Sequence, residues 1–162
     1  MNLKEAKKIG TSVLNELNQF IERGELAGSI RRKKPNVNDI DLVFLPKKEF
    51  MMLEKIRSIL KRYGNADVEG TKIIRIDSKE GINIDCYIAN EKNYEVLLLI
   101  RTGSKEHNKK LAMEALRQGK KLNFAEGLID IKTKNVVANT EKGIFEALGL
   151  PYIRPEERNS GK

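Results

Sequence analysis

The sequence GSIRR at residues 28–32, followed by DID at residues 39–41, is the part of the chain from which its fold and chemistry can be read. Side chains alternate between the faces of a β-strand, so Asp39 and Asp41 point one way while Ile40 points the other. Two carboxylates held this close repel each other unless a cation lies between them. Mg²⁺ suits that position because it takes oxygen ligands. The DID segment therefore predicts a strand that helps to bind a divalent metal.

The GSIRR segment supplies groups that bind anions. Gly28 lets the backbone approach a ligand closely, and Ser29 adds a hydroxyl. Arg31 and Arg32 follow, and guanidinium groups suit phosphate oxygens. Together with the backbone N–H groups of a turn, these side chains predict a polyphosphate site close to the two carboxylates.

A third carboxylate lies further along the chain. Residues 82–88 (INIDCYI) alternate like a strand, with Asp85 on the face opposite Ile84. Three carboxylates are enough to hold two metal ions. Asp77 is a rival for the third place, but it lies at a strand end beside the expected turn at residues 78–81. We therefore interpret Asp77 as part of the turn and Asp85 as the third ligand.

These features resemble the family X DNA polymerases, a branch of the nucleotidyltransferase superfamily typified by DNA polymerase beta. The shared pattern is a Gly-Ser turn with two arginines, an Asp-x-Asp between apolar residues, and a lone Asp on a later strand. Further segments match the same family: RTGS at residues 101–104, TEKGIF at 140–145, LGLPY at 148–152 and PEER at 155–158. The resemblance thus extends over residues 28–158.

The resemblance implies an α+β fold in two parts. Residues 1–102 would form the catalytic nucleotidyltransferase palm, a mixed sheet with helices on one face. Residues 103–158 would form a small α/β C-terminal thumb that contacts the nascent base pair and DNA, and residues 159–162 would be a tail. We expect a bare palm and thumb, similar to the small viral family X polymerases.

The resemblance also implies two-metal nucleotidyl transfer. Asp39 and Asp41 would bridge both metals, while Asp85 would bind the catalytic one and accept or relay the proton of an attacking 3′-hydroxyl. The ions would be two Mg²⁺, with Mn²⁺ as an alternative. The nucleotide would be bound by Gly28, Ser29, Arg32, Thr102, Gly103, Ser104 and Asn108. Arg31 matches a structural position of the family, so we expect it to form an ion pair within the fold.

Lys109 and Lys110 would face template or primer phosphates, although two solvated lysines on an exposed helix face would give the same sequence. Other positions depart from polymerase beta. Ile100 and Arg101 stand where it has two aromatic residues that help to exclude ribonucleotides, and Ala112 stands where it has a template-contacting arginine. Sugar discrimination and checking of the nascent pair are therefore open.

Two more departures concern the strand of Asp85. Asn83 and Tyr87 replace arginines that lie near the primer strand and the active-site aspartates in polymerase beta. Cys86 on the same strand has no partner cysteine in the sequence, so we expect it to fill the core.

The composition of the 162 residues describes a globular chain with a strongly charged surface, since 40% are hydrophobic and 33% charged. A net charge of +8 suits an anionic partner, here primer-template or gapped DNA and dNTP. No apolar run approaches the roughly 20 residues of a membrane span, and the N-terminus lacks a signal-peptide pattern. We expect a cytoplasmic monomer that does not associate with membranes.

Apolar periodicity and turn residues predict the secondary structure. Gly24 is expected to end the first helix, Phe50 to lie on the core face of the second, and Ser104 to cap a later one. The predicted helices span residues 2–22, 48–63, 93–100, 105–118 and 141–148. The predicted strands span residues 25–27, 40–45, 66–70, 72–77, 82–88, 121–124, 128–131 and 136–138.

Three functions remain in competition. The first is a template-directed DNA polymerase that fills short gaps in repair and releases pyrophosphate. The second is a template-independent or ribonucleotide-using nucleotidyltransferase acting on DNA or RNA ends, which the same carboxylates would serve equally well. The third is a nucleic-acid or nucleotide-binding module without catalysis, and the three intact aspartates argue against it. Small-molecule nucleotidyltransferases share the Gly-Ser and Asp-x-Asp pattern but give no reason for the basic charge or the later segments.

Overall fold

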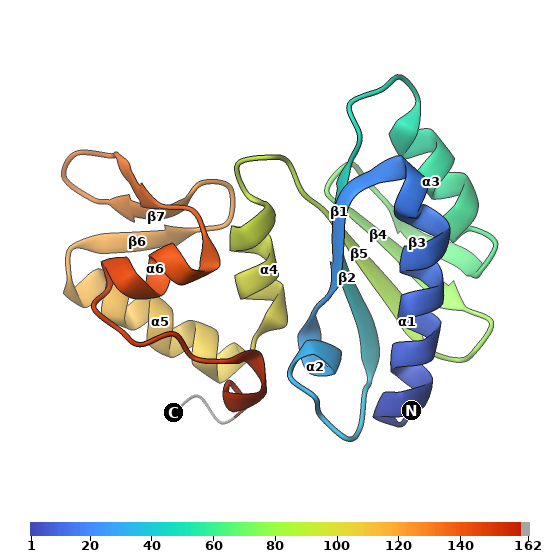
Figure 1. Cartoon of the computed structure of the whole chain (residues 1–162), viewed down its shortest axis with the longest axis horizontal. Coiled ribbons are helices and arrows are strands. Elements are labelled where there is room, and N and C mark those ends of the chain that lie inside the picture. The colour runs from blue at the N-terminus through green and yellow to red at the C-terminus, as the bar shows by residue number, and fades with distance from the viewer. Residues whose placement is uncertain (160–162) are drawn as a thin grey trace.

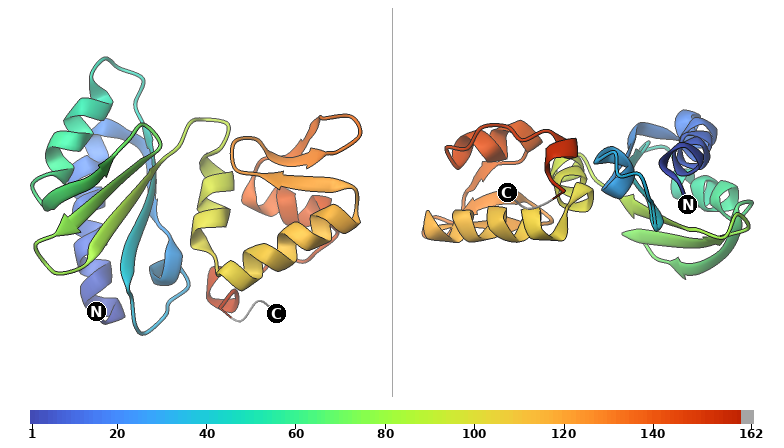
Figure 2. Two further views of the ribbon diagram at one scale, coloured as in Figure 1. Left: turned by 180° about the vertical axis from the view of Figure 1, so that it is seen from behind. Right: turned by 90° about the horizontal axis from the view of Figure 1, so that it is seen from below.

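A computed structural model describes residues 1–159, which fold into two lobes lying side by side (Figures 1 and 2). The elements of the first lobe are α1 (Leu3–Leu17), the 3-10 turn η1 (Asn18–Phe20), β1 (Ile21–Leu26), α2 (Gly28–Arg31), β2 (Asp39–Pro46), α3 (Met52–Leu60), β3 (Gly64–Glu69), β4 (Ile73–Ser78) and β5 (Asn83–Ile88). The remaining elements are α4 (Tyr94–Thr102), α5 (Lys105–Arg117), β6 (Lys120–Asn123), β7 (Gly127–Asp130), β8 (Val136–Ala138), α6 (Glu141–Ala147) and the 3-10 turn η2 (Pro155–Glu157). Among residues 1–159, no helix has the length and apolarity to cross a membrane.

The sheet of the first lobe is mixed, as expected for an α+β fold. Its strands lie in the order β1-β2-β5-β4-β3. The central strands β2 and β5 run parallel, whereas the other neighbours pair in antiparallel fashion. The parallel pair places the starts of β2 and β5 at the same edge of the sheet, and both starts carry aspartates.

One face of this sheet carries the main core. Ile40, Leu42 and Phe44 alternate along β2 and are fully buried under α1 and α3. The opposite face of β2 changes along its length: Asp39 and Asp41 come first, and Val43 and Leu45 follow, buried under α4. Helices therefore cover both faces, not one face as expected, but α4 leaves the aspartate end open.

The second lobe is a three-stranded antiparallel sheet, β6-β7-β8, packed with α5 and α6. Helix α4 lies between the two lobes (Figure 1). Leu97 and Leu98 of α4 pack with the first lobe, whereas Val96 and Leu99 pack with the second. Because one helix contributes to both cores, the boundary at residue 102 stays a prediction.

Two expectations about local structure are wrong. The first helix ends at Leu17, and Gly24 does not terminate it but lies within β1, opposite Phe44 of β2. A Cβ at residue 24 would lie 2.6 Å from Ile21 Cδ1 and 3.0 Å from Leu14 Cδ2, so those two side chains would have to shift to admit a larger residue. Phe50 is 89% exposed because α3 begins only at Met52, after a residue in the left-handed region. The helical period on which its burial was predicted does not extend to residue 50.

Candidate active site

Asp41 and Asp85 face each other across the parallel strands β2 and β5. They are register partners, as are Asp39 and Asn83 two residues earlier on each strand. Asp85 is buried at 4% exposure, Asp41 is half-buried and Asp39 is exposed. The structure therefore brings the predicted second and third carboxylates together, with the first at the open rim.

The pKa of Asp41 is strongly shifted by its surroundings in the site. Burial raises its pKa from the ordinary value to about 7, and the negative charges of Asp85 and Asp39 add to this effect. The guanidinium groups of Arg101 and Arg32 oppose it by lowering the pKa. Negative charge is thus concentrated on this sheet edge, as expected of a cation-binding site.

Arg75 is a functional candidate that the sequence reading missed. Its Nε donates to Asp85 Oδ1 at 2.6 Å and its Nη2 to Oδ2 at 3.3 Å. The signal was present, because a tight turn at residues 78–81 places Arg75 directly opposite Asp85 on the antiparallel strands β4 and β5. The exposure of the Arg75 side chain is 40%, so it can leave the carboxylate without disturbing the core.

The chemistry of the donor set fits a divalent metal. Carboxylate oxygens are the preferred ligands of Mg²⁺, and a bound cation would offset the charges of Asp85 and Asp39, which add to the effect of burial in raising the pKa of Asp41. Within residues 1–159, however, no three acidic, histidine or cysteine side chains are already placed as a ready metal-ligand group. Asp85 would have to exchange Arg75 for the metal in order to join Asp39 and Asp41.

Gly28 fits closely against the Asp41 carboxylate. Its φ is +55°, and a Cβ at this position would lie 2.1 Å from Asp41 Oδ2. The backbone also joins here, since Ala27 N–H donates to Asp41 C=O at 2.8 Å. Gly28 begins α2, whose first-turn N–H groups have no intrahelical acceptor. Glycine at residue 28 therefore lets the start of α2 pack directly against the Asp41 carboxylate, and Ser29 is the next residue of this turn.

Arg32 links this turn to the start of the second lobe. Its Nε donates to Asn159 Oδ1 at 2.8 Å, and its Nη1 donates to the carbonyl of Thr102. Burial lowers its pKa, and the charge of Asp41 opposes this effect. Gly103 follows with φ +70°, and a Cβ there would lie 3.0 Å from Arg32 Nη1. Arg32 is therefore near Asp41, as its predicted role on a triphosphate requires.

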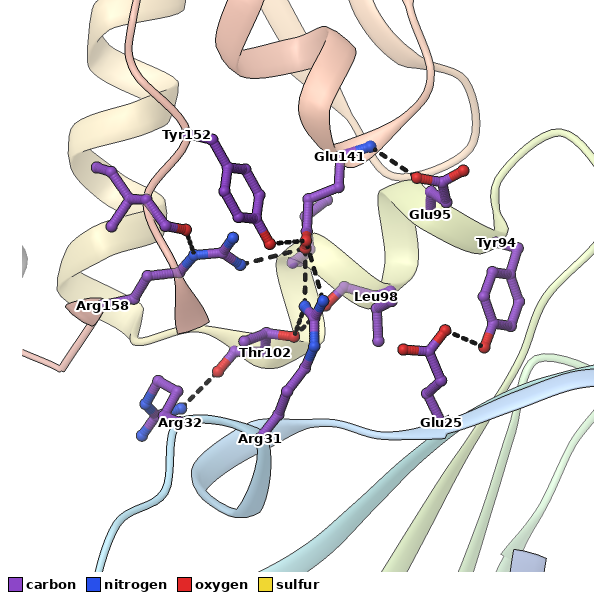
Figure 3. A network of polar contacts seen from close by, with 12 residues as sticks. Glu25, Arg31, Arg32, Tyr94, Glu95, Leu98, Thr102, Glu141, Tyr152 and Arg158 are labelled. Carbon is purple, nitrogen blue, oxygen red and sulfur yellow. Dashed lines mark hydrogen bonds and ion pairs between the residues drawn. The ribbon is translucent and has the colours of Figure 1, made fainter. Parts of the chain in front are cut away.

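Arg31 forms the internal ion pair expected from the sequence. It reaches from α2 to Glu141 at the first residue of α6, with Nη1···Oε2 2.8 Å and Nη2···Oε1 3.0 Å (Figure 3). The same carboxylate accepts from the Arg158 guanidinium at 3.2 Å and from the Tyr152 hydroxyl at 3.0 Å. Burial alone would raise the pKa of Glu141, but the hydrogen bonds from the two arginines outweigh it and lower that pKa to about 2.

The other predicted nucleotide ligands are held in structural hydrogen bonds. The Thr102 hydroxyl donates to Leu98 C=O and accepts from Arg31 Nη1. Ser104 is the N-cap of α5, as predicted, and accepts from His107 N–H at 3.2 Å. Asn108 Nδ2 donates to Ile100 C=O at 2.7 Å, so its contact with a base stays a prediction. The predicted DNA contacts, Lys109 and Lys110, are exposed on α5.

We expect Asp41 to make the metal-free protein less stable as the pH rises. Its pKa is about 7 in the folded state and near 3.8 when unfolded, so between these values the folded state binds more protons. Stability therefore falls from about pH 4 to pH 7. Asp41→Asn should be more stable than the wild type at pH 8 by about 1–3 kcal/mol. Urea unfolding in EDTA from pH 5 to pH 8 measures this difference, and equal slopes for both proteins would contradict it.

Arg75→Gln should tighten binding of Mn²⁺ about three- to tenfold, because it removes the cation that competes for Asp85. Calorimetric titration of the protein without nucleotide or DNA measures the affinity. Arg62→Gln is the matched control, since Arg62 is exposed in the turn after α3 and its replacement changes the net charge by the same amount. An equal change in both variants would show that only net charge matters.

Comparisons with known proteins all point to DNA polymerases and DNA nucleotidylexotransferases. A family model described as the DNA polymerase beta thumb matches residues 97–159. The DNA polymerase/3'-5' exonuclease PolX of Bacillus subtilis (strain 168) is 26% identical over 166 residues, covering 97% of this chain. The DNA nucleotidylexotransferase of Xenopus laevis is 36% identical over 83 residues (50% of this chain), and that of Eulemur macaco is 32% identical over 111 residues (66% of this chain).

The alignments cover only part of each of these relatives. The chain spans 28% of the Bacillus subtilis protein, 16% of the Xenopus laevis protein and 22% of the Eulemur macaco protein. The similarity to the first of them runs through both lobes, whereas the family model begins within α4.

Proposed function

Because this chain is a relative of the family X DNA polymerases, we propose that it is a nucleotidyltransferase that extends the 3′ end of DNA with dNTP on a template. The observation that carries the proposal is that β2, β5 and the α2 turn meet around the Asp41 carboxylate. Asp41 lies opposite Asp85, Gly28 packs on the Asp41 carboxylate, and Arg32 lies near enough to oppose the raised pKa of Asp41.

The reaction joins the 3′-oxygen of a primer to the α-phosphorus of the nucleotide and breaks the α–β phosphoanhydride, so pyrophosphate leaves. Asp39, Asp41 and Asp85 would hold two Mg²⁺ or Mn²⁺ ions. When bound, such ions neutralise the charge that develops on the attacking and leaving oxygens. Asp85, released from Arg75, would accept the 3′-hydroxyl proton on a carboxylate oxygen.

The triphosphate would lie against the α2 turn. Gly28 at the start of this turn packs on the Asp41 carboxylate, so the first-turn N–H groups and the Ser29 hydroxyl would donate to the triphosphate, and Arg32 would add a guanidinium. Gly103 would let the backbone approach the sugar, because glycine has no side chain and a Cβ there would lie against Arg32 Nη1. DNA phosphates would contact the exposed Lys109 and Lys110 on α5.

A second candidate is addition of nucleotides to DNA ends without a template. It is favoured by the similarity of half or more of the chain to the two DNA nucleotidylexotransferases. We rank it second because the alignment with the DNA polymerase/3'-5' exonuclease PolX covers 97% of the chain.

Primer extension on 5′-phosphorylated gapped DNA tests the proposal. Each of the four template bases is offered each dNTP and each rNTP singly, with Mg²⁺ or Mn²⁺, and a single-stranded primer serves as the untemplated substrate. Incorporation that follows the template base supports gap filling. Equal incorporation opposite every base, or extension of the single strand alone, favours the second candidate, and no extension of any substrate overturns both.

A further inference from the structure

A groove of about 510 Å³ lies on the side of α4 next to β4 and β5. It is bounded by the start of β4, the end of β5, one side of α4 and the turn between β6 and β7, and Figure 1 shows that turn beside α4. The side chains used below are Lys72, Tyr87, Arg101 and Phe124. The proposed function assigns no ligand to this groove.

Aromatic rings and cations meet in the groove. The Arg101 guanidinium carbon lies 4.2 Å from the centre of the Tyr87 ring and 5.6 Å from that of the Phe124 ring. Phe124 is 55% exposed, although it is a large apolar side chain at a turn. An exposed ring beside a stacked guanidinium is a surface on which another flat group can stack.

The charge of the groove has one sign. Lys72 and Arg101 are its charged lining residues, and among the residues that the structure describes no acidic side chain lines it. A ligand that combines a flat aromatic group with a negative charge matches this lining, and a nucleotide of a nucleic acid is such a ligand. The volume also suits one nucleotide better than a duplex.

The groove lies on the same face of the sheet as the carboxylate site. Tyr87 lies two residues beyond Asp85 on β5, so both side chains are on the same face of the sheet. Arg101 lies at the end of α4 near enough to affect the charge of Asp41. A strand that leaves the reaction centre along this face would therefore reach Tyr87, Arg101 and Phe124.

We propose that this groove binds one unpaired nucleotide of single-stranded DNA adjoining the site of nucleotidyl transfer. The base stacks on Phe124, and a backbone phosphate lies near Lys72 and Arg101. The proposal rests on the proposed function for the nature of the polymer, but the site is distinct from the carboxylates and the α2 turn. Stacking is tolerant of sequence because every base has a flat face, so we expect little base preference.

The test uses a short single-stranded oligonucleotide that contains 2-aminopurine, whose fluorescence falls when the base stacks. Titrations are done in EDTA, so that catalysis plays no part. Phe124→Ala should weaken binding about 5- to 100-fold and abolish the quenching. Phe50→Ala is the matched control, because Phe50 is 89% exposed in the segment between β2 and α3 and does not line the groove, and it should change neither.

Lys72→Ala is the second variant, with exposed Lys79→Ala as its control. It should weaken binding and reduce the salt dependence of the affinity, but keep the quenching. Equal binding and quenching by Phe124→Ala and the wild type would overturn the proposal, as would an equal loss in Phe50→Ala. Tighter binding of blunt duplex than of single strands would also overturn it.

These results are separable from those of the proposed function. If quenching depends on Phe124 but the protein extends no primer, the proposal that the groove binds a nucleotide is supported and the proposed polymerase function is rejected. Templated extension by a protein in which Phe124→Ala has no effect on binding would do the reverse. Phe124 is an exposed turn residue, so loss of folding is not expected to obscure the outcome.

Discussion

Replacement of Asp41 by alanine is expected to lower the rate of nucleotide addition by at least about 10³-fold, measured in single turnovers with saturating dNTP and Mg²⁺. Asp41 lies opposite Asp85, packs on Gly28 and feels the charge of Asp39. It is therefore the carboxylate common to the proposed metal site and the phosphate-binding turn. Without the Asp41 carboxylate, the proposed metal site would lose the ligand that contacts the phosphate-binding turn.

Asp77→Ala is the matched control for this loss. Asp77 is an exposed carboxylate on β4 of the same sheet, at the position that competed with Asp85 in the sequence. It should retain the wild-type rate. Removing a repelled carboxylate should preserve or raise the melting temperature, so a melting curve of Asp41→Ala separates loss of catalysis from unfolding. Extension by Asp41→Ala within tenfold of the wild type would contradict the assignment of the site.

Glu141→Gln should lower the free energy of unfolding by about 3–5 kcal/mol. The carboxylate is bound by Arg31, Arg158 and Tyr152, and Arg158 is fully buried. A neutral amide would leave two guanidinium groups without their counter-charge in the interior. Urea unfolding at pH 7 measures the change.

The pH dependence of this contribution follows from the lowered pKa of Glu141, about 2 in the folded state. The stabilisation is complete above the ordinary pKa near 4.5 and is lost as the pH falls toward 2. Glu157→Gln is the control, because Glu157 pairs with Arg154 on the exposed surface and should have little effect. A Glu141→Gln protein as stable as this control would contradict the structural role of the network.

Much of the architecture follows from local sequence signals. Alternation along residues 39–45 and 82–88 predicts strands β2 and β5 and the faces that carry Asp41 and Asp85. Ser104 predicts the start of α5, the predicted ends of β6 and β7 differ from the structure by one residue, and those of β8 agree with it. These features depend on neighbouring residues in the chain.

The parts that were missed depend on contacts between distant residues. Arg75 could be inferred only by following the hairpin register from the turn to Asp85. The convergence of Arg31 and Arg158 on Glu141 joins three segments whose spacing in the chain says nothing about their contact. Gly24 illustrates the opposite error, since a glycine within β1 that packs closely on Leu14 of α1 looked like the end of a helix.

Helix α4 has a consequence for any attempt to divide the molecule. Val96 and Leu99 on one side of it are completely buried in the second lobe, while Tyr94 and Leu98 on the other side are buried in the first. In a fragment that ends at Thr102, the apolar side chains of α4 that pack on the second lobe would be exposed to solvent. The fragment that begins at Gly103 would lack those side chains from its core. Protease cleavage at Gly103 should therefore yield two halves that stay associated, and recombinant halves should precipitate unless they are expressed together.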